Sequence, residues 1–292
     1  MATAYTECLN WVCPDVPMAP VALVTNAIRD AVIELCEKAL IYRQELQQIN
    51  VLASTSTTTT AAASSGATAV VVADITDFAA NDTLTVDLTD GTKWRGHVSG
   101  TPSGSTINLD GALNEDVESG ATVTRLVYLY TVTYPSGFTL AKGLQAWFND
   151  APIDPISPDD LDTEFNNTSF GWVGVNWRTD VNLPTRWYME DTNTVGILMS
   201  PSAGGALRIN AALKPTRAST TFPTVIYEDY IETIAHGAKA RIMLIPKKPY
   251  SDKETGKYHE LEFNGLVGEA RLIAAKGSTR GPLRTHTVFG LR

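Results

Sequence analysis

The spacing of apolar residues changes twice along this chain, and that change restricts the fold more than any single motif does. Residues 20–50 and 223–277 place apolar side chains three and four positions apart, which predicts amphipathic helices. Residues 83–127, between them, alternate apolar and polar side chains, which predicts short β-strands. Neither an all-α nor an all-β fold accommodates both patterns, so we expect an α+β protein.

The first helix is predicted over residues 20–50. Glu34 and Lys38 lie four positions apart in the order that stabilises a helix. At 1.5 Å per residue the helix would be about 45 Å long, so we expect it to contact a neighbouring body. The apolar stripe of this helix consists of Val24, Ile28, Ala31, Leu35, Ala39, Tyr42 and Leu46.

A low-complexity segment rich in Thr, Ser and Ala, residues 52–67, follows and predicts a linker at a domain boundary. After it, Asp90-Gly91 is typical of a hairpin turn between two strands. We expect residues 54–130 to form a small β-barrel or sandwich whose core is marginal at this size. The predicted strands are residues 83–88, 93–98, 106–109 and 122–127.

Two helices separated by a proline-rich turn are predicted near the C-terminus. The first begins near Thr224 and is stopped by Pro246. Ser251 and Glu254 have the spacing of a capping box, which predicts the start of a second helix that ends at Gly277. The apolar stripe of the second helix consists of Tyr258, Leu261, Gly265, Gly268, Leu272 and Ala275.

Glycines within that stripe need a compensating interaction, because each costs about 0.5 to 1 kcal/mol relative to alanine inside a helix. Close approach of the preceding helix would supply it. Gly237 and Ala238 are suitable counterparts for Gly265 and Gly268, which predicts a tight antiparallel αα-hairpin. The alternative, glycines that are merely tolerated, stays open.

The last segment, residues 278–292, has neither a helical nor a strand period. Two interpretations stay open: a free tail, or an extended arm that becomes ordered on a partner. In the second case the arginines would bind carboxylates and Phe289 would be an apolar anchor. The residues that would make the contacts are Arg280, Arg284, His286, Val288, Phe289 and Arg292.

The formal net charge of −9 and a charged fraction of 19% argue against a protein that grips nucleic acid, which needs a basic face. Passage of DNA without binding remains compatible with this charge. No apolar run approaches the roughly 20 residues that cross a bilayer, so we expect a soluble chain without membrane contact. The three cysteines lack metal-site spacing, and we expect reduced thiols.

A search for chemistry finds no catalytic residue, metal ligand set or cofactor motif. His259-Glu260 resembles the start of a zinc-protease helix, but position 263 is Phe, so the second histidine is missing. An acidic run lacks the spacing of a calcium loop. An aromatic group could form a sugar-binding platform, although a core cluster is the more common structure. The acidic run is Asp159, Asp160, Asp162 and Glu164, and the aromatic group is Trp172, Trp177, Trp187 and Tyr188.

Three separated blocks carry a resemblance to a known family. They are AIRDAVIELCEKALIYR (27–43), LKPTRASTTFPTVIYEDYIETIAHGAKARIMLIPKKPYSD (213–252) and KYHELEFNGLVGEARLIAAKG (257–277). In this order they closely resemble the head-to-tail adaptor proteins of tailed bacteriophages, which are also called head completion or connector proteins. Residues 54–130 interrupt the family pattern.

The resemblance implies a structural virion protein that is not an enzyme and needs no cofactor. Its body, residues 1–53 and 131–277, would be a helical bundle of the N-terminal helix and the C-terminal αα-hairpin, with strands and loops between them. The β domain would be inserted, and residues 278–292 would be an arm that docks on the portal protein. The adaptor would form a twelve-fold ring that lets genomic DNA pass without specific binding. Tail nozzle, tail tube or fibre proteins would attach to it. A carbohydrate- or receptor-binding tail component is the alternative function.

Overall fold

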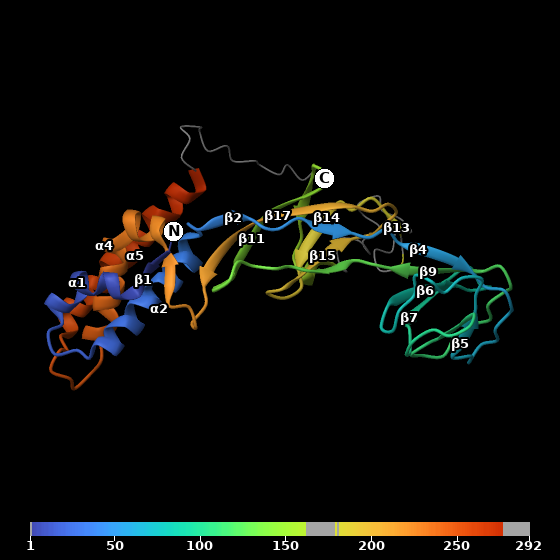
Figure 1. Cartoon of the computed structure of the whole chain (residues 1–292), viewed down its shortest axis with the longest axis horizontal. Coiled ribbons are helices and arrows are strands. Elements are labelled where there is room, and N and C mark those ends of the chain that lie inside the picture. Colours follow the sequence, from blue (N-terminus) through green and yellow to red (C-terminus); the bar gives the residue numbers. More distant parts are fainter. Residues whose placement is uncertain (1, 162–178, 180, 277–292) are drawn as a thin grey trace, which may run out of the picture. The chain divides into compact units, whose positions relative to one another are not determined.

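The computed structural model describes residues 2–161, 179 and 181–276 (Figure 1). The chain divides into two compact units. The helical unit comprises Met1–Leu46, Tyr134–Leu144 and Asn210–Arg292, and the β unit comprises Gln47–Thr133 and Gln145–Ile209.

Three long helices form the core of the helical unit and lie side by side (Figure 1). Their buried apolar faces share one cluster that includes Ile28, Leu35, Ile234 and Phe263. A short antiparallel pair, β1 with β18, joins the start of the chain to the start of the second long helix. The elements are β1 (Ala2–Ala4), η1 (Tyr5–Cys8), α1 (Leu9–Val12), η2 (Cys13–Asp15), α2 (Val21–Ala39), β18 (Thr221–Pro223), α4 (Thr224–Met243) and α5 (Lys253–Lys276).

Helix α2 ends at Ala39, eleven positions before the predicted end of the helix at residue 50. Leu40 has a left-handed backbone conformation, with φ of 54°, which terminates the helix. The Tyr42 ring then packs on Phe138, with ring centroids 5.1 Å apart. Tertiary pairing therefore overrides the helical periodicity of residues 40–50, which contribute two short strands instead.

A large sheet of eight strands follows the order β10-β15-β14-β12-β11-β17-β2, with β3 also paired to β17. Strand β12 runs parallel to β14, and β11 and β17 have residues in both units. A separate parallel pair joins β13 (Val181–Asn182) to β16 (Ser200–Pro201). The sheet strands are β2 (Arg43–Glu45), β3 (Ile49–Val51), β10 (Leu129–Thr131), β11 (Phe138–Phe148), β12 (Ala151–Pro155), β14 (Arg186–Met189), β15 (Thr194–Leu198) and β17 (Gly205–Pro215).

This sheet overturns the expected fold class. A helical-bundle body with a small β insertion is wrong, because strands hold more of the described residues than α-helices do and the large sheet forms much of the molecule. The long strand β11 has no clean alternation of buried and exposed residues. The sequence of β11 therefore does not predict a strand by alternation. Sequence-distant pairing, such as that of residues 43–45 with 210–212, creates much of the sheet.

A second sheet region in the β unit matches the alternating pattern. The four strands predicted there are present, and the Asp90-Gly91 turn has the positive φ of 81° at Gly91 that such a hairpin favours. Leu84, Val86 and Ile107 lie in its own buried cluster. The strands are β4 (Thr55–Thr58), β5 (Ala69–Val71), β6 (Thr83–Asp87), β7 (Lys93–His97), β8 (Thr106–Asn108) and β9 (Thr122–Leu126).

The linker predicted over residues 52–67 is wrong in part. Residues 55–58 form β4, which pairs antiparallel with β9. Threonine has a high β propensity, and cross-strand pairing stabilises a segment whose sequence has no alternation of apolar and polar residues. Low complexity in the sequence therefore does not prevent regular structure here.

The start of α5 is shifted by one position from the predicted capping box, with Asp252 and Thr255 in place of Ser251 and Glu254. Helix α4 stops before Pro246, as predicted. At the start of α5, Asp252 is the capping residue, because its carboxylate accepts hydrogen bonds from the backbone N–H groups of Glu254 and Thr255. The Thr255 hydroxyl also donates to this carboxylate at 2.6 Å, and these hydrogen bonds lower the pKa of Asp252. Ser251 is the residue before the cap.

Candidate assembly surface

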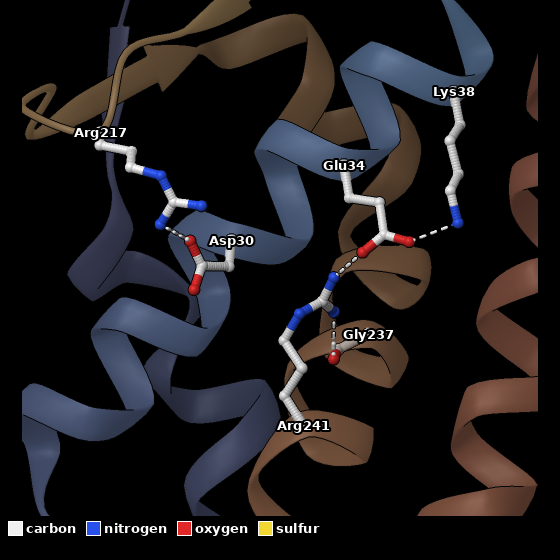
Figure 2. A network of polar contacts seen from close by, with 6 residues as sticks. All are labelled: Asp30, Glu34, Lys38, Arg217, Gly237 and Arg241. Atoms are coloured by element: carbon white, nitrogen blue, oxygen red, sulfur yellow. Dashed lines mark hydrogen bonds and ion pairs between the residues drawn. The ribbon is translucent and has the colours of Figure 1, made fainter.

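An arginine on α4 links the first two long helices through charged contacts (Figure 2). Arg241 pairs with the carboxylate of Glu34 on α2, and its second terminal nitrogen donates to the Gly237 carbonyl oxygen at 2.6 Å. Glu34 also pairs with Lys38 at 2.5 Å, which confirms the interaction predicted from their spacing. The Arg241 guanidinium also lies 5.3 Å from the centre of the Phe263 ring of α5, so this side chain of α4 contacts both other long helices.

Close contact between α4 and α5 depends on Gly237. A Cβ atom at this position would lie 2.7 Å from two carbons of the Phe263 ring and 3.0 Å from the Ala31 Cβ. Gly237 and Ala238 are both buried. On α4, Gly237 therefore lets α5 approach closely, and the side chain of α5 that it accommodates is the Phe263 ring.

Helix α5 has two apolar stripes, and only one of them is covered by the described part of the chain. The covered stripe consists of Gly256, His259, Phe263, Val267 and Ala270. The other, which we name the α5 stripe, consists of Tyr258, Leu261, Gly265, Gly268, Leu272 and Ala275, all of them exposed.

The α5 stripe is therefore a largely exposed apolar face, in which the Tyr258 ring meets the edge of His236 on α4 at a centroid distance of 6.3 Å. Leu261 is 72% exposed, Leu272 57% and Tyr258 56%, and the neighbouring Ile273 is 58% exposed. Cβ atoms at Gly265 and Gly268 would meet nothing within 4 Å. The structure does not bring these two glycines to Gly237 or Ala238. Both stripes have helical spacing, and periodicity cannot tell which of them faces the core.

The residues of the predicted docking arm lie outside the described part of the chain. These are Arg280, Arg284, His286, Val288, Phe289 and Arg292.

Other candidate sites from the sequence are not assembled in the described residues. Trp187 and Tyr188 are buried at 2% and 3% exposure, so they belong to a core and not to a surface platform. Trp172, Trp177, Asp162 and Glu164 lie outside the described residues, while Asp159 and Asp160 form part of η3 (Pro158–Asp160). Within residues 2–161, 179 and 181–276, no three His, Cys, Asp or Glu side chains gather where a metal ion could bind.

The cysteines are free thiols. Cys8 and Cys36 are buried, and burial raises the pKa of each to about 12, which keeps both protonated and unreactive at neutral pH. Sequence reasoning missed the role of Arg241. The contact with Gly237 lies four residues back in the same helix and is a local one. The partner carboxylate of Glu34 lies 207 positions away in the sequence, so spacing could not predict that pair.

Comparison with known proteins agrees with the sequence resemblance. No helix in the part of the chain that the structure describes is long and apolar enough to span a membrane. No curated protein matches the chain. The sequence profile of the family described as SU10 adaptor protein matches residues 3–286, nearly the whole length. The chain therefore belongs to the SU10 adaptor protein family, whose members are structural adaptors of phage virions.

Proposed function

We propose that this protein is the head-to-tail adaptor of a phage neck, where about twelve copies form a ring between the portal and the tail. Residues 278–292 dock on the portal protein, and the ring continues the DNA channel. The same ring is the platform to which a tail nozzle, tail tube or fibre protein attaches. Family membership supports the adaptor role, and the α5 stripe is the observation that supports assembly into a ring.

The α5 stripe has the geometry that a partner helix requires. Its residues alternate spacings of three and four, a mean of about 3.5, which is the spacing of helix-packing seams. From Tyr258 to Ala275 the stripe extends about 26 Å at 1.5 Å per residue. Gly265 and Gly268 open a notch at its centre, where a neighbouring backbone can approach. Contact with a neighbour would compensate the helix-forming cost of both glycines.

A ring of identical copies supplies such a neighbour. In a closed ring each copy presents one surface to the next copy and a different surface to the previous one. An exposed helix face in the isolated chain then becomes a subunit interface. We therefore assign the α5 stripe to the contact with the adjacent copy, and Gly265 and Gly268 to the packing of that contact.

Residues 278–292 are suited to the portal contact by their composition. The segment has three arginines and no acidic residue, in a chain whose formal net charge is −9. It also follows α5 directly, so a ring built through α5 would hold many copies of the segment in register. Several weak contacts held together in this way bind far more tightly than one.

Assembly with the portal tests the proposal. The purified protein is mixed with portal rings, sedimented and imaged by negative stain, and we expect an added ring on the portal. Deletion of Ser278–Arg292 should abolish co-sedimentation while the circular dichroism spectrum keeps its helical signal. Unchanged co-sedimentation of the deletion variant would refute the docking role.

A matched pair of substitutions tests the stripe. Leu261→Asp places a charge in the proposed subunit contact, and we expect a folded protein that forms no ring. Leu52 is 56% exposed on the β unit, so Leu52→Asp makes the same chemical change elsewhere and should leave ring formation intact. Normal rings from Leu261→Asp would remove the stripe from the interface without affecting the adaptor role.

A further inference from the structure

Two histidines meet where α4 and α5 pack together. The Nδ1 atom of His236 on α4 lies 3.0 Å from the Nδ1 atom of His259 on α5. Their ring centroids are 4.9 Å apart with an interplanar angle of 65°. His259 is only 9% exposed, and His236 is half-buried. The contact therefore joins the two helices inside their interface.

The number of protons decides whether this contact can exist. In the neutral pair, one ring donates its Nδ1–H to the lone pair on Nδ1 of the other ring. A first added proton can enter the Nε2 of the donor ring, and the Nδ1–H···Nδ1 bond remains. A second added proton leaves N–H groups on both facing nitrogen atoms. Two donors and two positive charges then face each other at 3.0 Å, so the contact must open.

The carboxylates around the pair do not offset its burial and the positive charge beside it, since the pKa of each ring is lowered despite them. Glu262, Glu232 and Asp15 favour a positive charge on His236, but Asp15 is already paired with Lys239 at 2.5 Å. Lys239 adds a positive charge that acts on both rings. The titratable groups that act on the pair or line the adjoining cavity are Asp15 from η2, Glu232 and Lys239 from α4, Tyr258 and Glu262 from α5, and Tyr250 and Asp252 from the turn between the helices.

We propose that the His236–His259 pair makes the α4–α5 hairpin sensitive to acid, so that uptake of the second proton separates the first turns of α5 from α4. The histidine pair lies on the covered face of α5, the helix that carries the α5 stripe. Acidification therefore loosens the element on which the stripe is displayed. The inference concerns the fold of the hairpin and does not depend on ring formation.

The direction of the pH effect follows from the two environments. Burial, with smaller contributions from neighbouring positive charge, lowers the pKa of both histidines below the ordinary value of 6.5. Below about pH 6.5 the two histidines therefore bind more protons in the unfolded chain than in the folded hairpin. Stability is fully present above that pH and is lost as the pH falls. For each proton that only the unfolded chain binds, the unfolding equilibrium constant at pH 5.5 is about tenfold higher than at pH 7.5.

Urea unfolding of the full chain at pH 7.5 and pH 5.5 tests the proposal with two matched variants. In the natural protein the unfolding equilibrium constant should be about tenfold higher at pH 5.5 than at pH 7.5. His236→Gln keeps a hydrogen-bonding side chain that cannot be protonated and leaves the buried His259 as the only ring of the pair that titrates, so the rise should be clearly smaller than in the natural protein. His97→Gln removes a histidine of strand β7 instead and should retain the full rise. An undiminished rise in His236→Gln, or its loss in His97→Gln, would overturn the proposal.

A second measurement needs no substitution and applies even where the His236→Gln variant fails to fold. Long-range ¹H–¹⁵N spectra of the imidazole rings report which nitrogen carries the proton. At pH 7.5 we expect one ring of the pair protonated on Nδ1 and the other on Nε2. Two rings that are both protonated only on Nε2 at this pH could not share a hydrogen bond through Nδ1, and the proposal would be rejected.

Discussion

At the scale of single residues, the glycines of the α4–α5 hairpin occupy two different environments. Gly237 is buried where the Phe263 ring leaves no room for a Cβ atom, whereas Gly265 and Gly268 are surrounded by open space. All three lie inside helices, where glycine is unfavourable. For Gly237 the close approach of α5 compensates that cost within the chain. For the other two the chain itself contains no compensation among its described residues.

The same substitution at two of these positions should therefore have opposite effects. Gly237→Ala forces the Phe263 ring to move, and overpacking of this kind outweighs the gain in helix propensity, with a net loss of about 1 kcal/mol or more. Gly265→Ala meets nothing and should stabilise the monomer by up to about 1 kcal/mol. Thermal unfolding of the unassembled protein measures both. A higher melting temperature for Gly237→Ala would contradict the close contact.

At the scale of elements, two arginine–carboxylate pairs attach other parts of the helical unit to α2, and they differ in burial (Figure 2). Arg241 is 27% exposed and also donates to a backbone carbonyl, while Arg217 is 83% exposed and pairs with Asp30 at 3.1 Å. Water competes poorly at the first pair and freely at the second. The position of α4 on α2 should therefore depend on Arg241 far more than on Arg217.

Replacement of each arginine by alanine measures that difference. Arg241→Ala removes two charge-assisted hydrogen bonds, one to the Gly237 carbonyl and one to Glu34, which keeps its pair with Lys38, and we expect a loss of about 1.5 to 3 kcal/mol. Arg217→Ala should cost less than about 1 kcal/mol, as exposed pairs do. Urea denaturation at low and high salt would separate the two. Equal losses for both variants would mean that the Arg241 pair adds no more than a surface contact.

At the scale of the whole molecule, the balance of charge determines how the protein meets DNA. The chain has 23 Lys and Arg against 32 Asp and Glu. Binding to duplex DNA arises mainly from neutralised phosphates and released counterions, which a net negative charge disfavours. An adaptor through which a genome passes benefits from this property, since a basic lumen would hold the DNA.

We therefore expect no retardation of duplex DNA by the purified protein at physiological salt in an electrophoretic mobility assay. Removal of residues 278–292 takes away three arginines and changes the formal charge from −9 to −12, so the truncated chain should also leave DNA free. Retardation by the full chain would contradict the expected absence of DNA binding. Retardation that disappears with the truncation would place the DNA contact on that segment.

How far the sequence predicts this protein depends on how local the interactions are. Strands β6 and β7 and the stop of α4 before Pro246 were predictable, because alternation, turn residues and proline act over a few positions. The end of α2 was not, since residues 43–45 leave the helical pattern to pair with residues 210–212. Asp252 rather than Ser251 caps α5 for a similar reason: both residue types can cap, and the turn decides between them.

The sequence by itself determined the family, the mixture of helices and strands, the acidic character and one apolar stripe of α5, because these follow from residue identity and short-range spacing. Only the tertiary structure decided that the eight-stranded sheet dominates, that Arg241 meets Glu34, and that the stripe with Gly265 and Gly268 faces outward. Each of these depends on which distant segments bury their apolar surface against one another. Which segments pair depends on the free energy of the whole packed core, and the local spacing of residues does not reveal it.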